Sequence, residues 1–287
     1  MTSIVIPAYN EGRTITRCLE TLLEHAQPGE FEIAVVANGC HDDTADRARA
    51  FSDRGVVVVE TQVGNKTNAL NLGDDAVSRF PRIYLDADIL VDAQTLRLLA
   101  ASLTEESEWV VAAPRAVIDY QSRPLPIRAF YHVWTRLPYF TAGIVGAGVY
   151  AFSERGRQRF DRFPDIIADD EFARLQAAPH ERGNPKEGSF TITPPTRLSG
   201  LVDIQTRARA GLLELKERFP ALQHNNASNS VGSLQVILRS PQLWMGAPIY
   251  LSVMAMAQYR AKEKIKKRLH KVWERDDSAR VAFQQGT

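Results

Sequence analysis

The sequence predicts an α/β protein built on a mostly parallel, twisted sheet flanked by helices. Over the first 115 residues, short runs rich in Val, Ile and Phe alternate with stretches whose apolar residues recur at helical spacing. Alternation of this kind produces parallel sheets with right-handed crossovers. The chain has 287 residues, of which 44% are hydrophobic and 24% charged, as in ordinary globular proteins. Ligands of such sheets bind beyond the carboxyl ends of the strands.

Each element of this region follows from its local pattern. The first helix, for example, has an apolar stripe of Ile15, Leu19, Leu22 and Leu23. The expected strands cover residues 3–6, 31–36, 56–60, 83–85 and 109–113. The expected helices cover residues 11–24, 42–51, 67–78 and 93–103.

The alternation stops after Pro114. Residues 120–152 are rich in aromatic side chains, and residues 179–195 combine proline, glycine and mixed charge, which predicts a mobile loop. From Leu234 to the end the chain is expected to be mainly helical.

Composition narrows the class of protein. A net charge of +1 argues against a nucleic-acid partner. Cys18 and Cys40 supply neither a disulfide framework nor a Cys-x-x-Cys metal site, and the chain opens on a strand-like run without a signal peptide, so we expect a cytoplasmic protein.

The longest apolar stretch, residues 243–257, is interrupted by Gly246 and Pro248. It is shorter than the roughly 20 residues that a spanning helix needs. One interpretation is a buried helix. The other is an interfacial helix whose basic continuation, from Arg260 to Lys271, favours anionic lipid and a peripheral location at the inner face of the membrane.

Two carboxylates end the fourth expected strand, in the run Ile83-Tyr-Leu-Asp-Ala-Asp-Ile-Leu90. Residues two apart on a strand point the same way, so Asp86 and Asp88 can address one site. Mg²⁺ and Mn²⁺ prefer oxygen ligands and commonly combine one or two carboxylates with substrate phosphates. The pair therefore predicts a divalent-cation site, and the alternative is an ordinary acidic turn.

Groups suited to a nucleotide stand at the ends of the neighbouring strands. Tyr9, after the first strand, can stack on a base. Asn38 ends the second strand with an amide able to read a base edge, and Gly39 permits a tight turn there. Lys66 opens the third helix and puts a cation near the phosphate end.

Together these segments resemble the inverting nucleotide-sugar glycosyltransferases of family 2, which have a GT-A fold. The resemblance covers most of residues 1–215 and rests on Ile6-Pro-Ala-Tyr-Asn-Glu11, on Lys66-x-x-Ala-Leu-Asn-x-Gly73 and on the acid pair. It implies a nucleotide-sugar donor and a divalent cation, Mn²⁺ or Mg²⁺, that neutralises the leaving diphosphate. It also implies that Asp88 binds the cation directly, with Asp86 as second metal residue and nearer the ribose. The residues assigned to the nucleotide are Pro7, Ala8, Tyr9, Glu11, Asn38, Lys66 and Asp86.

Inverting transfer needs a base to take the proton of the acceptor hydroxyl. Residues 166–175 contain three adjacent acids, which resemble the family's Glu-Asp motif at a helix start, with Asp169 in place of the glutamate and Asp170 as the base. Adjacent carboxylates raise one another's proton affinity, which suits a base. Alternatively, these acids merely stabilise the first turn of a helix.

Three further features refine the donor and the product. Arg207 and Arg209 are candidates for diphosphate binding, or belong to a solvated helix face. Many relatives carry an aspartate where Asn38 stands, and an amide oxygen can replace it as acceptor for the uracil N–H, so we expect a UDP-sugar. Residues 178–222 lack the Gln-x-x-Arg-Trp element of processive synthases, which favours transfer of a single sugar. The acceptor, whether glycan, lipid-linked molecule or small molecule, stays open.

The resemblance also sets the expected domains: a GT-A domain over residues 1–233, with a nucleotide half (1–115) and an acceptor half (116–233), and a helical extension over 234–287. The sequence leaves two other functions as alternatives. A sugar nucleotidyltransferase would carry a Gly-rich, basic phosphate loop after the first strand, unlike residues 7–12. A catalytically silent sugar-nucleotide-binding protein would not need both acidic clusters.

Overall fold

The computed structural model describes residues 1–141, 148–226 and 230–267. The chain forms two compact units and passes between them several times. The first unit comprises Met1–Ala116, Ile144–Asp165 and Asp169–Thr191, and the second comprises Val117–Gly143, Ile166–Ala168 and Ile192–Thr287. The domain boundaries expected at residues 115 and 233 stay predictions.

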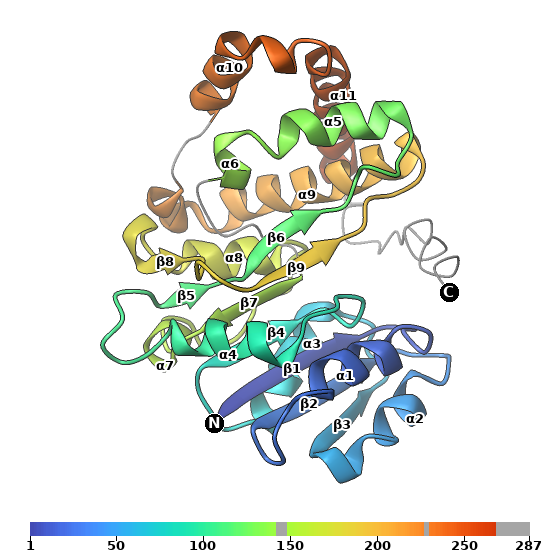
Figure 1. The fold of residues 1–287 in the computed structure, drawn as a ribbon, viewed down its shortest axis with the longest axis vertical. Helices are drawn as coiled ribbons and strands as arrows, with labels where there is room; N and C mark the ends of the chain where they lie inside the picture. The colour runs from blue at the N-terminus through green and yellow to red at the C-terminus, as the bar shows by residue number, and fades with distance from the viewer. Residues whose placement is uncertain (142–147, 227–229, 268–287) are drawn as a thin grey trace. The chain divides into compact units, whose positions relative to one another are not determined.

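The first unit contains a seven-stranded, mostly parallel sheet, as predicted (Figure 1). Three strand pairs at one side, β3–β2, β2–β1 and β1–β4, are parallel, whereas β7 is antiparallel to both of its neighbours, β4 and β5. The pair β5–β8 is again parallel. In sheet order the strands are β3 (Val56–Thr61), β2 (Phe31–Asn38), β1 (Thr2–Ala8), β4 (Arg82–Leu85), β7 (Val149–Phe152), β5 (Val111–Ala112) and β8 (Arg182–Gly183).

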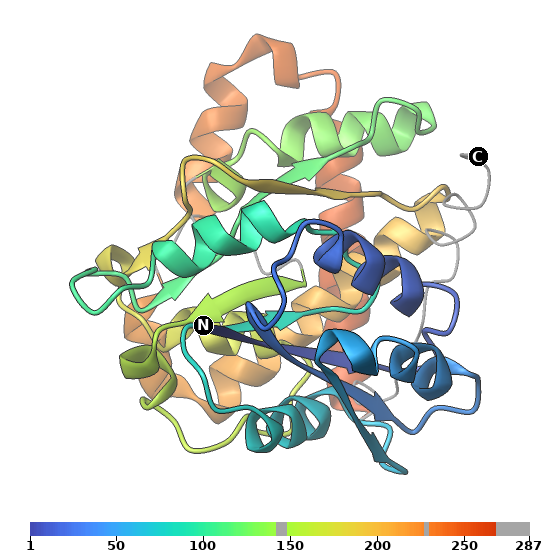
Figure 2. The ribbon, with the colours of Figure 1, turned by 60° about the horizontal axis from the view of Figure 1, so that its bottom comes forward.

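The helices of the α/β region lie where the periodicity predicts them. They are α1 (Ile15–Leu23), α2 (Thr44–Arg49), α3 (Lys66–Ala76) and α4 (Ala93–Ala101), and the 3-10 turn η1 covers Ser52–Arg54. Helices α1 and α4 lie on one face of the sheet and α3 on the other (Figures 1 and 2). All seven residues of β1 are buried, because a strand covered on both faces has no polar side. The predicted stripe of α1 is buried in full.

One expectation about this unit is wrong. Residues 179–195, expected to form a loop, contain the 3-10 turn η2 (Pro179–Glu181), strand β8 and strand β9 (Ser189–Ile192). Strand β9 pairs with β6 (Arg115–Ile118) in a two-stranded sheet. Phe190 is buried between exposed neighbours, a period of two that the surrounding prolines and glycines obscure in the sequence. The first unit also contains the short helices α7 (Glu154–Arg157) and α8 (Asp169–Leu175).

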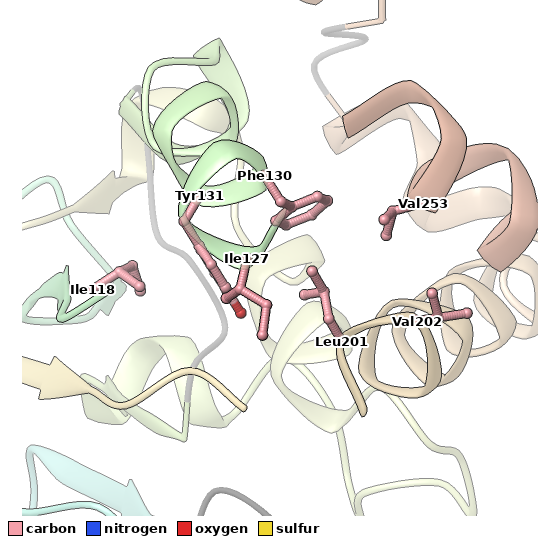
Figure 3. Close-up of a cluster of buried hydrophobic side chains, with 7 residues drawn as sticks. All are labelled: Ile118, Ile127, Phe130, Tyr131, Leu201, Val202 and Val253. Carbon is pink, nitrogen blue, oxygen red and sulfur yellow. The ribbon is translucent and has the colours of Figure 1, made fainter. Parts of the chain in front are cut away.

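The second unit is helical and has its own apolar core. Its helices are α5 (Leu125–Trp134), α6 (Pro138–Thr141), α9 (Leu198–Arg218), α10 (Ser230–Arg239) and α11 (Ala247–Lys266), with 3-10 turns η3 (Pro220–Asn225) and η4 (Pro241–Leu243). Figure 3 shows part of the core, in which side chains of α5, α9 and α11 converge. The aromatic residues Phe130 and Tyr131 are buried in this core. Part of the aromatic run is therefore structural.

The helical character expected from Leu234 onwards is confirmed as far as residue 267. The apolar stretch 243–257 contributes most of α11, which begins at Ala247 rather than at Leu243. Among the residues that the structure describes, no helix is both long enough and apolar enough to cross a membrane. The end of the basic segment, including Arg268 and Lys271, lies outside the described residues.

Candidate active site

Asp86 and Asp88 lie in the turn that follows β4. Because β4 ends at Leu85, the two-residue alternation of a strand does not orient these side chains, and the geometric argument from the sequence is wrong on this point. The Asp86 backbone N–H donates to the Gly148 carbonyl at 2.7 Å, and the Ile89 N–H donates to the Asp86 carbonyl at 3.0 Å. The Asp86 side chain is 34% exposed, and Asp88 is an exposed residue of the turn.

Gly148 permits this turn to approach the start of β7. Its φ is +87°, and a Cβ at this position would lie 2.8 Å from Ile89 Cγ1 and 3.1 Å from Asp86 Oδ2. A side chain here would therefore meet both an unfavourable backbone conformation and the carboxylate of the candidate site.

Lys66 joins the two acidic clusters. Its Nζ lies 2.8 Å from Asp86 Oδ1 and 3.2 Å from Asp169 Oδ1. Helix α3 places it there, since Asn65 caps the helix by accepting the Asn68 N–H at 2.9 Å. Burial alone would lower the pKa of Lys66, but the charges of Asp169, Asp86 and Asp170 outweigh it and raise that pKa. Lys66 is therefore a permanent cation between carboxylates.

The three acids at the start of α8 have different surroundings. Asp169 is buried, and the Tyr150 hydroxyl donates to its Oδ2 at 3.2 Å. Glu171 is also buried and forms a two-point ion pair with Arg174, at 2.7 and 2.6 Å. Asp170 is half-buried, and its Oδ1 accepts the Glu171 backbone N–H at 2.7 Å.

The pKa values of three aspartates are raised. Burial is the largest cause for Asp86, Asp169 and Asp170, and the positive charge of Lys66 opposes it in each case. For Asp170 the nearby charge of Glu171 raises the pKa further. A carboxylate with a raised pKa holds a proton more readily, which is what a general base requires.

The exits of β1 and β2 are tied together by hydrogen bonds. The Asn38 amide nitrogen donates to the Ala8 carbonyl at 2.8 Å, and Asn10 Oδ1 accepts the His41 N–H at 2.8 Å. Asn10 has a φ of +51°, as in a tight left-handed turn. Gly39, with a φ of +64°, makes the turn expected from the sequence. The amide nitrogen of Asn38 is thus engaged by a backbone carbonyl of β1.

The other residues assigned to the nucleotide lie in this region. Pro7 and Ala8 are buried in β1, and the Tyr9 ring packs against Gly64, where an added Cβ would be 3.4 Å from Tyr9 Cε2.

Glu11 holds the start of α1. Its carboxylate accepts the Thr14 hydroxyl at 2.5 Å, and its backbone N–H donates to Thr44 Oγ1 at 2.7 Å. These contacts give Glu11 a part in the loop's structure, and its part in nucleotide binding stays a prediction.

Arg207 and Arg209 lie on α9, in the second unit. Arg207 is exposed, and Arg209 lies near Tyr250 of α11, where its charge opposes the rise in pKa that burial gives that phenol. Their assignment to the diphosphate stays a prediction.

The donor set fits a hard divalent cation only with help from a substrate. Within residues 1–141, 148–226 and 230–267, no three His, Cys, Asp or Glu side chains are grouped so as to hold a metal ion. Asp88 is an exposed residue of this turn, and one oxygen of Asp86 contacts Lys66. A cation beside Asp88 therefore fits if phosphate oxygens complete its ligands, as is common for Mg²⁺.

The sequence did not indicate the role of Tyr150. Its hydroxyl binds Asp169, and its ring stacks on Tyr84 of β4 with centroids 5.1 Å apart. Tyr150 and Tyr84 are directly paired across β7 and β4. The pairing of those strands is antiparallel and long-range, and local patterns do not specify it.

Comparison with solved structures identifies the fold. The chain superposes on a mannosyltransferase of Pyrobaculum calidifontis with a TM-score of 0.60, at 18% identity, covering 99% of this chain and 79% of that one. It superposes on glucosyl-3-phosphoglycerate synthase of Mycobacterium tuberculosis with a TM-score of 0.53, at 18% identity, covering 75% and 78% of the two chains. Both share its GT-A architecture.

Sequence relatives are glycosyltransferases that match in part. Glycosyltransferase AglE of Haloferax volcanii is 33% identical over 90 residues, which is 30% of this chain and 30% of the relative. Glycosyltransferase AglD of the same organism is 29% identical over 182 residues, 58% of this chain and 28% of the relative. The chain thus spans less than a third of the length of these two proteins.

The family itself is shown by a broader match. The model of glycosyl transferase family 2 covers residues 3–160, which is more than half of the 287 residues and includes β1 to β4, the acid pair and β7. The chain belongs to glycosyltransferase family 2.

Proposed function

We propose that the protein transfers a single sugar from a nucleoside-diphosphate sugar to an acceptor hydroxyl, with inversion at the anomeric carbon. The observation that carries this proposal is the pair of contacts made by Lys66, which bring the turn after β4 and the start of α8 to one ammonium group. A donor-side carboxylate and a base-side carboxylate thereby belong to the same site, as inverting transfer requires.

On the donor side, Asp88 is the protein ligand of a divalent cation and Asp86 is directed to the ribose. When bound, the cation neutralises the charge that develops on the leaving diphosphate. Two structural neighbours support this assignment: the mannosyltransferase was solved with GDP-Man and Mn²⁺, and the synthase with uridine-diphosphate-glucose and Mn²⁺.

For the base of the donor we propose uracil. The Asn38 amide nitrogen is engaged by Ala8, so the group that remains to meet a base edge is an acceptor oxygen, suited to an N–H such as that of uracil. Guanine also presents an N–H to such an acceptor, but guanine is a purine and is larger than uracil. Comparison of UDP with GDP therefore tests the assignment directly.

On the acceptor side, Asp170 accepts the proton of the attacking hydroxyl. The hydroxyl oxygen forms a bond to the anomeric carbon as the bond from that carbon to the diphosphate oxygen breaks, and the nucleoside diphosphate leaves with the electron pair. Asp170 suits this role better than its neighbours because Asp169 is bound to Lys66 and Tyr150, and Glu171 to Arg174.

A titration of nucleotides tests the donor side. UDP and GDP are titrated into the protein with Mn²⁺, with Mg²⁺ and with EDTA, and the Asp88→Asn variant is measured alongside. We expect binding in the presence of metal to fall by at least about tenfold in EDTA, and Asp88→Asn to bind equally with and without metal. Tight binding by the wild type that EDTA does not change would contradict the role of Asp88.

A further inference from the structure

One face of α11 carries both apolar and cationic exposed side chains. Leu251 is 50% exposed and Tyr259 is 68% exposed, and they are followed on the same side of the helix by Lys262 and Lys266, which are also exposed. Spacings of three, four or eight residues place these side chains in one stripe. The opposite side, with Val253 and Ala257, is buried against the second unit's core. The stripe is thus apolar in its first half and cationic in its second.

The segment before α11 also exposes large apolar side chains. Met245, between η4 and α11, is 93% exposed, and Trp244 is 57% exposed while its indole N–H donates to the Ile237 carbonyl at 3.1 Å. Leu234 and Leu238 of α10 are 54% and 63% exposed. Four large exposed apolar side chains within twelve residues, one of them an amphipathic indole, are typical of an interface with lipid.

We propose that this surface, made by α10, η4 and the exposed stripe of α11, binds an anionic lipid bilayer. The apolar side chains enter the boundary between headgroups and acyl chains, and Lys262 and Lys266 contact headgroup phosphates. The described part of this region, residues 230–267, has six cationic side chains and one carboxylate, Glu263, for a net charge of +5 (six minus one). This local excess contrasts with the net charge of +1 for the whole chain.

The charges on the neighbouring side of α11 are partly neutralised. Arg260 lies 3.0 Å from Asp203 of α9, and Lys267 lies 4.0 Å from Glu263. Lys262 and Lys266 are therefore the cations that we assign to the lipid phosphates.

A second copy of the chain fits this surface less well than lipid does. A parallel pairing of two stripes would place lysines against lysines, and an antiparallel pairing would press the lysines of one copy onto Leu251 and Tyr259 of the other. Either arrangement buries cations without carboxylates, which is strongly unfavourable. An anionic bilayer satisfies both halves of the stripe at once, because lysine stems can extend to the phosphates.

Vesicle flotation tests the proposal. The full chain is mixed with vesicles of phosphatidylcholine alone and with vesicles containing about one third phosphatidylglycerol, at low and high salt. We expect flotation with the anionic vesicles only, reduced by salt because the attraction is screened. The double variant Lys262→Glu/Lys266→Glu should partition at least about 25-fold more weakly, from about 1 kcal/mol for each cation lost.

Two further variants make the result specific. Arg79→Glu/Lys186→Glu changes the net charge by the same amount at exposed positions of the first unit, and it should float like the wild type. Met245→Ser/Leu251→Ser should float weakly while circular dichroism and transfer to a soluble acceptor are unchanged. The proposal is overturned if the wild type does not float, if both charge variants behave alike, or if Met245→Ser/Leu251→Ser converts a dimer to a monomer in light scattering. Transfer activity is measured separately, so failure here leaves the proposed function untouched.

Discussion

Lys66 contacts one carboxylate from each acidic cluster, and this explains how several aspartates can be gathered in a half-buried site. Two buried carboxylates close together repel each other and take up protons, whereas a shared ammonium group offsets part of that cost. The 2.8 and 3.2 Å contacts are within ion-pair distance for both partners. We therefore interpret Lys66 as a residue that positions Asp86 and Asp169, in addition to its predicted closeness to the phosphates.

Replacing Asp170 by Asn should abolish most transfer and spare donor binding. An amide cannot take the proton of the acceptor hydroxyl, and loss of a general base typically costs about 10²- to 10⁴-fold in rate. Initial transfer rates and a nucleotide titration with Mn²⁺ measure the two effects separately. Asp169→Asn is the informative comparison: because Asp169 contacts Lys66 and Tyr150, we expect it to weaken donor binding as well. Glu187→Gln, at an exposed position, serves as the control. Full activity of Asp170→Asn would move the base elsewhere.

The pH dependence of transfer should report the same carboxylate. Burial and the charge of Glu171 raise the pKa of Asp170 above its ordinary value, so the base is protonated and inactive at a higher pH than an exposed aspartate would be. We expect kcat/KM to rise with pH through that raised pKa and then level off. A profile measured at saturating metal, with vesicle-free enzyme, checks this. If the rise of kcat/KM with pH instead occurred at the pKa of an ordinary exposed aspartate, the role of Asp170 as the base would be contradicted.

At the scale of elements, the site depends on the ends of strands rather than on their middles. The turn after β4 is held by the start of β7, and the loops after β1 and β2 are bound to each other through Asn38 and Asn10. Each connection joins segments far apart in the chain. Because these hydrogen bonds fix the strand ends, the polar side chains that they carry are held in a defined position at the site.

Gly148→Ala should disturb the turn that carries Asp86. Alanine at a φ of +87° is strained, and its Cβ would lie 2.8 Å from Ile89. Gly55→Ala is a matched control, because Gly55 has a φ of +84° but nothing within 4 Å of an added Cβ. Both variants should lose about 1 kcal/mol of unfolding free energy from the backbone conformation. Only Gly148→Ala should also lose transfer activity and bind the donor more weakly, as measured by chemical denaturation and nucleotide titration. Equal activity of the two variants would show that this close approach is unimportant.

At the scale of the whole molecule, the two units have different chemical character. The first is an α/β sheet with the titratable residues of the candidate site, and the second is a helical unit with an aromatic core and a partly exposed apolar and basic surface. The family model matches residues 3–160, so the candidate base Asp170 and helices α9 to α11 lie outside the matched residues.

Much of this architecture was predictable from local patterns. The strands and helices of the first 101 residues lie close to their predicted ranges, because a period of about 3.6 residues, a β-branched run or a glycine acts over short distances along the chain. The same is true of the two acidic clusters and of the polar residues at strand ends. The sequence alone thus determined the fold class, the family and the candidate residues.

Only the tertiary structure decided how those residues meet. The contacts of Lys66 with Asp86 and Asp169, the insertion of β7 antiparallel beside β4, and the strands within residues 179–195 all depend on segments distant in sequence. The contacts of Asp169 with Lys66 and Tyr150 arise in the same way, whereas Glu171 pairs locally with Arg174. Three adjacent acids look alike in a sequence, and burial and long-range partners are what make one of them a candidate base.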